Sequence, residues 1–124
     1  MVRFLSDEWI AALDAAAREA ALPGDVRLTI QQVVTRDGDA VAYHLVLGDG
    51  RARVHPGRAE SPDVTLVQTR EVAAALSRGE LNAQQALEAG LLKLRGDIGR
   101  LGREGRALTA VGDVFAAVRS TTDY

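Results

Sequence analysis

The segment from Pro62 to Asp97, PDVTLVQTREVAAALSRGELNAQQALEAGLLKLRGD, constrains the fold more than any other part of the chain. It contains, in order, the patterns of a strand, a helix, a break, a second helix and a second strand. Its apolar residues are small or aliphatic, and it holds no cluster of polar side chains suited to catalysis. This combination predicts a protein that holds an apolar molecule and does not react with it.

Capping residues define the two predicted helices of this segment. Thr69 can cap a helix over residues 70–79, which Gly79 ends because glycine readily adopts the left-handed conformation. Asn82 can cap a second helix, over residues 83–90. The flanking strands alternate apolar and polar residues, as half-buried strands do.

The N-terminal half predicts one helix and then an antiparallel meander. Ser6 can cap the helix, whose apolar residues recur at helical spacing until Leu22-Pro23-Gly24 stops it. Three strand-like segments follow, separated by Asp-Gly pairs that are typical of hairpins: residues 25–35, 40–50 and 51–57.

From Asp97 the pattern is helical to the end of the sequence, but glycines recur three residues apart at positions 96, 99, 102 and 105. Each glycine inside a helix costs about 1 kcal/mol relative to alanine, so this part of the helix is predicted to be weak or interrupted. Two functional interpretations stay open: a phosphate-binding loop, although no GK[ST] follows, and a movable flap over a cavity mouth.

Composition disfavours several classes of function. The 124 residues are 47% hydrophobic and 26% charged, with a net charge of −2 and no cysteine. A nucleic-acid-binding domain usually shows a clustered basic face, and a membrane-spanning helix needs about 18 or more apolar residues in a row. We therefore expect one domain over residues 1–124 in a bacterial-type cytoplasmic protein.

The side chains that could act in catalysis or bind a metal are scattered along the sequence. Neither His44 nor His55 has a second ligand at metal spacing, and no serine lies in a nucleophile elbow. The acidic residues occur where solvated or capping carboxylates are usual. The basic residues Arg51, Arg53 and Arg58 predict a solvated strand edge, with contact to anionic head groups as the alternative. We expect no catalytic residue, no metal and no cofactor.

The chain resembles the type-2 sterol carrier protein family over essentially its whole length. The resemblance is carried by an acidic-x-Thr strand, a Gly-x-x-Asn break, and a Gly-x-Leu-x-Leu-x-Gly-Asp ending: Asp63-Val64-Thr65-Leu66, Leu76, Gly79-Glu80-Leu81-Asn82, Ala86, Gly90 and Leu92-Lys93-Leu94-Arg95-Gly96-Asp97. FLSDEW near the start and DVFAAVRSTT near the end also look like small stand-alone bacterial members.

The resemblance implies an α+β fold in which a five-stranded, largely antiparallel sheet carries helices over one face. It also implies an apolar tunnel between sheet and helices that binds a fatty acyl, fatty acyl-CoA or sterol-like ligand.

The scarcity of aromatic residues independently favours an internal cavity. The chain has one tryptophan, two tyrosines and two phenylalanines, and alanine-rich helices have few large side chains to fill the space above a sheet to normal density. A dry void costs about 20–30 cal/mol per Å³, whereas each ligand methylene buried in it returns about 0.8 kcal/mol. Close packing of the small residues is the alternative.

We predict that apolar side chains from the 62–97 segment and the last helix line this cavity: Val64, Leu66, Val72, Leu76, Leu81, Ala86, Leu87, Leu92, Leu94, Leu101, Leu108, Val111, Phe115 and Val118. Trp9 is expected near its edge. A ligand head group can meet Gln68, Arg100 or Arg103.

The predicted partner is a small hydrophobic ligand, without nucleic acid; transient membrane contact and the oligomeric state stay open. A protein-interaction or accessory-subunit module that uses the same groove is the alternative function. An enzyme for an apolar substrate is disfavoured because no base–nucleophile constellation is visible.

Overall fold

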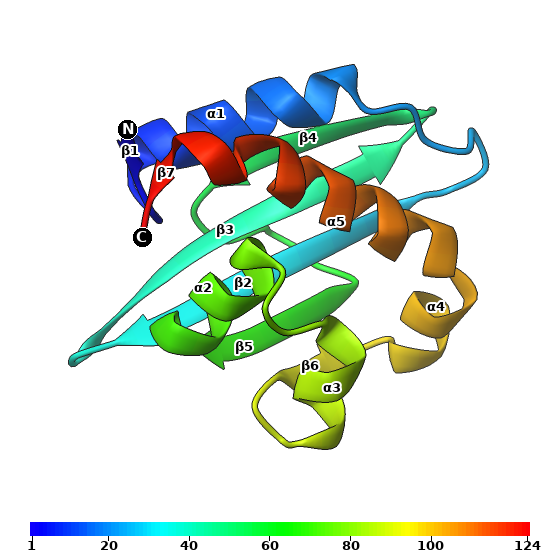
Figure 1. Ribbon diagram of the computed structural model, residues 1–124. Coiled ribbons are helices and arrows are strands. Elements are labelled where there is room, and N and C mark those ends of the chain that lie inside the picture. Colours follow the sequence, from blue (N-terminus) through cyan, green and yellow to red (C-terminus); the bar gives the residue numbers. More distant parts are fainter.

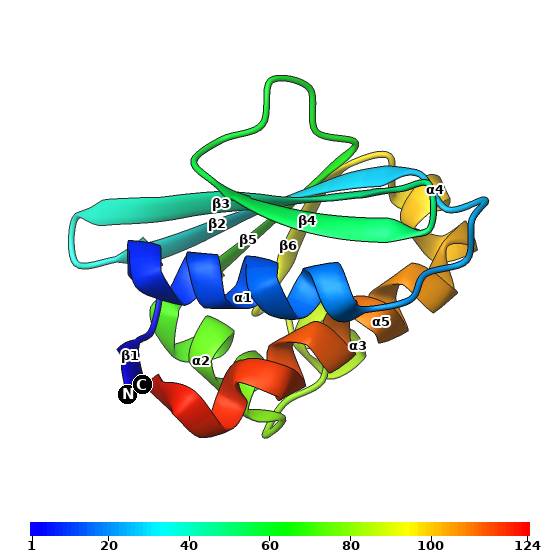
Figure 2. The ribbon, with the colours of Figure 1, turned by 90° about the horizontal axis from the view of Figure 1, so that it is seen from above.

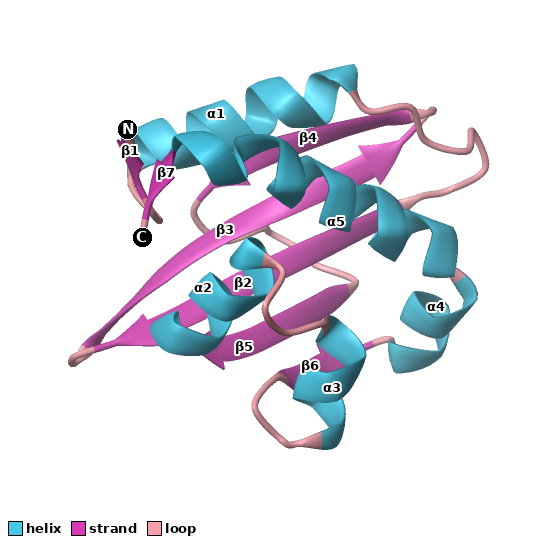
Figure 3. Ribbon diagram, in the orientation of Figure 1, coloured by secondary structure: helices cyan, strands magenta, loops and turns pink.

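The computed structural model describes residues 1–124 apart from the side chain of Leu108. A five-stranded sheet with strand order β4-β3-β2-β5-β6 forms its centre, and helices cover one face of it (Figure 1 and Figure 3). The strands are β2 (Leu28–Arg36), β3 (Asp39–Gly48), β4 (Arg51–Pro56), β5 (Val64–Thr69) and β6 (Lys93–Gly96). The helices are α1 (Asp7–Glu19), α2 (Arg70–Arg78), α3 (Ala83–Glu88), α4 (Ile98–Arg103) and α5 (Gly105–Val118). The predicted α+β architecture is confirmed.

All neighbouring strands of the sheet are antiparallel except β2 and β5, which run parallel. The connection from β4 to β5 must therefore cross the sheet, and residues 57–63 arch over the face opposite the helices (Figure 2). This loop is held where Ala59 N donates to Gln31 Oε1 at 2.8 Å. The prediction of a largely antiparallel sheet is confirmed.

The core lies between the sheet and the helices. Leu28 and Ile30 of β2 point towards the helices and are almost fully buried. From the helical layer, α1 lies over β4 and buries Trp9, Leu13 and Ala17 completely. These large side chains fill the space above β3 and β4, whereas the alanines of α2 lie over the other half of the sheet.

The three predicted helix caps are confirmed. The side-chain oxygens of Ser6, Thr69 and Asn82 each accept a hydrogen bond from the backbone N–H three residues later, at 3.1, 3.3 and 2.8 Å. Gly79 ends α2 with a φ of 79°, as expected of a left-handed C-cap. The first helix ends at Glu19, before the stop predicted at Leu22-Pro23-Gly24.

The predicted interruption within the glycine series is confirmed, whereas the prediction that the helical pattern from Asp97 continues to the end of the sequence is wrong. The helix is interrupted at Glu104, between α4 and α5, within the glycine series. After α5 the chain turns through a 3₁₀ helix, η1 (Arg119–Thr121), into a short strand, β7 (Thr122–Asp123). This strand pairs in parallel with β1 (Val2–Arg3), and Phe4 N just after β1 donates to Asp123 O at 2.9 Å.

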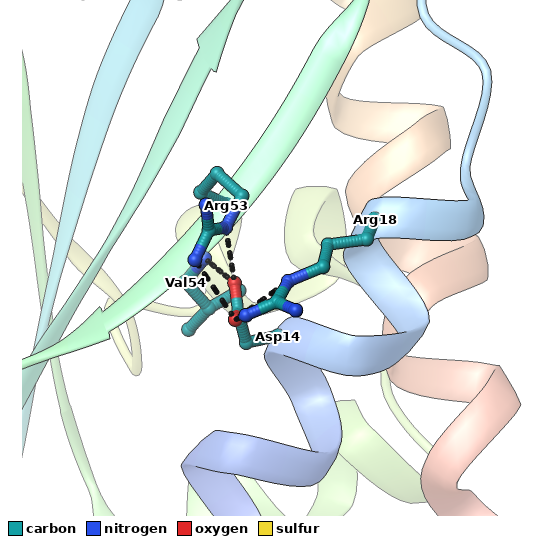
Figure 4. Close-up of polar contacts among 4 residues, drawn as sticks. All are labelled: Asp14, Arg18, Arg53 and Val54. Carbon is teal, nitrogen blue, oxygen red and sulfur yellow. Dashed lines mark hydrogen bonds and ion pairs between the residues drawn. The ribbon is translucent and has the colours of Figure 1, made fainter.

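One buried carboxylate ties α1 to the edge strand β4 (Figure 4). Asp14 is 8% exposed and accepts hydrogen bonds from Val54 N at 2.8 Å, Arg53 Nε at 3.0 Å and Arg18 Nη2 at 2.7 Å. Burial alone would raise the pKa of Asp14, but these hydrogen bonds outweigh it and lower the pKa from 3.8 to about 2. The interpretation of all the acidic residues as solvated or capping is therefore wrong for Asp14.

Replacing Asp14 with Asn is expected to lower the free energy of unfolding by about 2 kcal/mol at pH 7, because the folded-state pKa lies below the unfolded one. This contribution is complete well above pH 3.8 and disappears as the pH falls to about 2. The difference in the free energy of unfolding between wild type and Asp14→Asn, measured by urea unfolding, should therefore become smaller at acid pH. Asp49→Asn is the control, because its ion pair with Arg27 is exposed and contributes less than about 0.5 kcal/mol. An equal loss of unfolding free energy in Asp14→Asn and Asp49→Asn would contradict a stabilising role for the buried Asp14 carboxylate.

Candidate ligand-binding cavity

A cavity of about 330 Å³ lies between the sheet and the helices, on the side of β2 and β5. Its lining combines residues from the β1–α1 turn, strands β2, β3 and β5, α2, the α2–α3 segment, the position before β6, α5 and η1. These residues are Phe4, Gln32, Tyr43, Leu66, Gln68, Ala73, Leu76, Ser77, Gly79, Leu81, Asn82, Ala83, Leu92, Val111, Gly112, Phe115 and Arg119. Its volume is at the lower end of the range for small-molecule sites.

The floor of the cavity is the inner face of the sheet. Strand pairing places Gln32 of β2 beside Tyr43 of β3 and Leu66 of β5. Gln68 follows on the same face of β5 and donates from Nε2 to Gln32 Oε1 at 2.8 Å. The floor therefore joins an apolar part at Leu66 to a polar part formed by two buried amides and one tyrosine.

The walls are aliphatic and the mouth opens at the surface. Leu76 of α2, Leu81 and Leu92 form one wall, and Val111 and Phe115 of α5 form the other. At the outer end the lining residues are exposed: Gly79, Asn82 and Ala83 from the α2–α3 segment face Gly112 and Arg119 from the C-terminal segment. A ligand can therefore enter between α5 and the α2–α3 segment (Figure 1).

An aromatic cluster closes one end of the cavity. Trp9 is fully buried and packs against Phe4, Tyr43 and Phe115, with ring centroids 4.9, 5.6 and 6.1 Å away. Those three rings line the cavity and Trp9 does not. The tryptophan thus lies behind the cavity wall, where it fixes the rings that border the ligand space.

The structure brings six of the fourteen predicted lining residues to the cavity: Leu66, Leu76, Leu81, Leu92, Val111 and Phe115. Four others are buried elsewhere in the core: Val64, Ala86, Leu101 and Val118. Three more lie at other surfaces and do not border the cavity: Val72 and Leu94 are half-buried, and Leu87 is exposed. The side chain of Leu108 lies outside the described residues. Contact with a ligand remains a prediction for the six.

Of the three residues predicted to meet a ligand head group, only Gln68 lines the described cavity. Gln68 lies on the floor, as described above, whereas Arg100 does not line the cavity and donates instead to Asp63 Oδ1 at 2.8 Å. Arg103 is exposed and does not line the cavity. Sequence reasoning missed Gln32 and Tyr43; the strand alternation, which turns both towards the helices, was the available signal.

The described lining of the cavity holds no His, Cys, Asp, Glu or Lys side chain. Burial raises the pKa of Tyr43, so its phenol stays neutral and acts as a hydrogen-bonding group. Within the described residues, no three His, Cys, Asp or Glu side chains gather as a metal site would require. His44 and His55 do lie face to face across β3 and β4, with ring centroids 5.3 Å apart, but on the opposite face of the sheet.

Comparison with protein families agrees with this architecture. Residues 10–103 match the model of the SCP-2 sterol transfer family. The chain belongs to this family. The resemblance predicted from the sequence is therefore confirmed, and the family is one of sterol and lipid carriers. Among curated protein sequences, none matches the chain.

In the described part of this SCP-2 family member, no helix is both long and apolar enough to span a bilayer.

Solved structures of sterol carrier proteins share the fold. A conserved hypothetical protein from Thermus thermophilus, suggested to be a sterol carrier protein, is 21% identical with a TM-score of 0.75, over 98% of this chain and 91% of its own. Sterol carrier protein 2 is 19% identical with a TM-score of 0.72, over 94% and 97%. Palmitated SCP2L2 from Aedes aegypti is 22% identical with a TM-score of 0.62, over 84% and 90%.

Proposed function

We propose that this SCP-2 family protein binds and transfers a single-chain lipid in the cavity and catalyses no reaction. The observation that carries the proposal is an aliphatic cavity of about 330 Å³ that opens at the surface beside α5. Leaving an apolar space of this size empty would cost about 8 kcal/mol, comparable with the whole stability of a small domain. A hydrocarbon chain removes that cost.

The size of the cavity favours a chain of medium length over a sterol. A water molecule takes up about 30 Å³ of the liquid and a methylene is of similar size, so 330 Å³ holds about eleven such groups. A sterol has more than twice as many carbon atoms. The palmitated Aedes aegypti relative of this fold supports an acyl ligand. We therefore propose an acyl chain of about ten carbons inside the cavity, with longer chains extending through the mouth.

Decanoic acid is expected to raise the melting temperature of the protein. A ligand at one hundred times its dissociation constant adds about 2.7 kcal/mol to the free energy of unfolding, which corresponds to about 10 °C for a domain of this size. Differential scanning calorimetry with decanoic acid, and with the equally charged but short acetic acid as the control, measures this shift. An unchanged melting temperature across a saturating series of fatty acids would contradict the proposed function.

A further inference from the structure

We infer that the cavity selects lipids whose buried end carries a hydroxyl group, such as an ω-hydroxy fatty acid of about ten carbons. The inference rests on the proposed function and deepens it, because it specifies the chemistry at the inner end of the ligand. It is carried by the polar part of the cavity floor, formed by Gln32, Tyr43 and Gln68.

Tyr43 presents a buried hydroxyl to the ligand space. The residue is 4% exposed and lines the cavity. Among the described residues, Trp9 Nε1 is the one fully enclosed polar side-chain atom without a hydrogen bond, so the Tyr43 hydroxyl is accessible to a small molecule. Its raised pKa keeps it protonated, so it offers one O–H donor as well as acceptor lone pairs. An accessible hydroxyl at the wall of a cavity can pair with a polar group of the ligand or with a water that the ligand displaces.

The glutamine pair supplies the complementary groups. Gln32 and Gln68 are 7% and 6% exposed, and their shared hydrogen bond uses the Gln32 carbonyl and one Gln68 N–H. The Gln32 amide N–H groups and the Gln68 carbonyl are left over within the described structure. Together with Tyr43 they offer donors and an acceptor on one small area. A hydroxyl, which both donates and accepts, can satisfy them at once.

Charge decides against a carboxylate at this inner end. Arg119 is the one positively charged side chain of the described cavity lining, and it is exposed at the mouth, where its Nε donates to Ser77 O at 2.8 Å. A buried carboxylate on the floor would have no counter-charge, which makes its desolvation unfavourable. A methyl end would leave the Tyr43 hydroxyl and the amide groups outside the Gln32–Gln68 hydrogen bond without a partner on the ligand. The hydroxyl therefore fits the floor, and a carboxylate fits the mouth.

The test compares decanoic acid with ω-hydroxydecanoic acid by isothermal titration calorimetry. Wild type is expected to bind the hydroxy acid at least about tenfold more tightly, since a site built to hydrogen-bond a hydroxyl rejects the analogue that lacks it. Tyr43→Phe should lose this preference, which is measured as the ratio of the dissociation constants of the two acids for the same variant. Tyr124→Phe is the matched control: it also removes one tyrosine hydroxyl, but Tyr124 does not line this cavity, so the preference should persist.

The outcomes separate the inference from the proposed function. Equal binding of both acids by wild type, or an unchanged preference in Tyr43→Phe, would overturn the hydroxyl inference while lipid binding stands. Failure of wild type to bind either acid, or palmitic acid, would overturn the proposed function and the inference with it.

Discussion

Replacing Gly112 with Trp is expected to weaken the binding of decanoic acid by about a hundredfold. Gly112 lies on α5 and lines the cavity mouth, and a Cβ atom added there meets no atom within 4 Å. An indole that enters this space displaces about four ligand methylenes, which removes about 3 kcal/mol of binding free energy. The helix itself should tolerate the change, because tryptophan has a higher helix propensity than glycine.

Gly102→Trp provides the matched control. Gly102 lies on α4, also has open space around its added side chain, and does not line the cavity. Calorimetric titration with decanoic acid should therefore show wild-type affinity for Gly102→Trp. An equal loss of affinity for decanoic acid in Gly112→Trp and Gly102→Trp, or full affinity in Gly112→Trp, would mean that ligands do not enter through this mouth.

Replacing Gly96 with Ala is expected to destabilise the fold by roughly 3 kcal/mol or more. Gly96 ends β6 with a φ of 100°, and a Cβ at this position would lie 2.4 Å from the backbone oxygen of Asp63. The same carbonyl accepts a hydrogen bond from Asp97 N at 2.9 Å. The strand can therefore admit a side chain only if β5 and β6 separate, which would also disturb Leu92 at the cavity wall.

Gly90→Ala separates the two causes of the lost stability in Gly96→Ala, which are the positive φ and the clash with the Asp63 carbonyl. Gly90 has a φ of 74° but no atom within 4 Å of its added Cβ, so it should lose only the conformational part, about 1–2 kcal/mol. Urea unfolding of both variants measures the difference. A loss in Gly96→Ala no larger than in Gly90→Ala would show that the close approach of β5 and β6 is not essential.

Local signals made most of the fold predictable. Ser6, Thr69 and Asn82 are capping residues that act within one helical turn, and the Asp-Gly pairs act within one hairpin, so neighbouring residues suffice to recognise them. The parallel pairing of β1 with β7 could not be predicted, because two-residue strands carry no periodicity and depend on residues from opposite ends of the sequence.

The cavity was predictable in kind but not in detail. Aliphatic residues such as Leu76 and Leu92 reach it from elements that the pattern identified. The polar floor depends on strand register, which sets Gln32 beside Tyr43 from a different strand. In the same way, Asp14 looks like an ordinary helical carboxylate until β4 brings Arg53 to it. Such pairings follow from tertiary structure, and a single sequence does not reveal them.

The purpose of the glycine series is now partly explained. Gly96 is required by the approach of β6 to Asp63, and the chain breaks between α4 and α5 at Glu104, next to Gly105. The break lets α5 turn back over the sheet and place Val111 and Phe115 at the cavity. Of the four glycines, Gly96 is thus the one whose lack of a side chain the structure requires.

Native mass spectrometry of the purified protein tests the central claim most directly. After organic extraction of any lipid that copurifies, addition of one equivalent of decanoic acid should convert the bare protein into a single one-to-one complex, and Gly112→Trp should remain bare. A protein that stays bare with every fatty acid tested, and that gains stability only from a partner protein, would contradict the account and favour an interaction module.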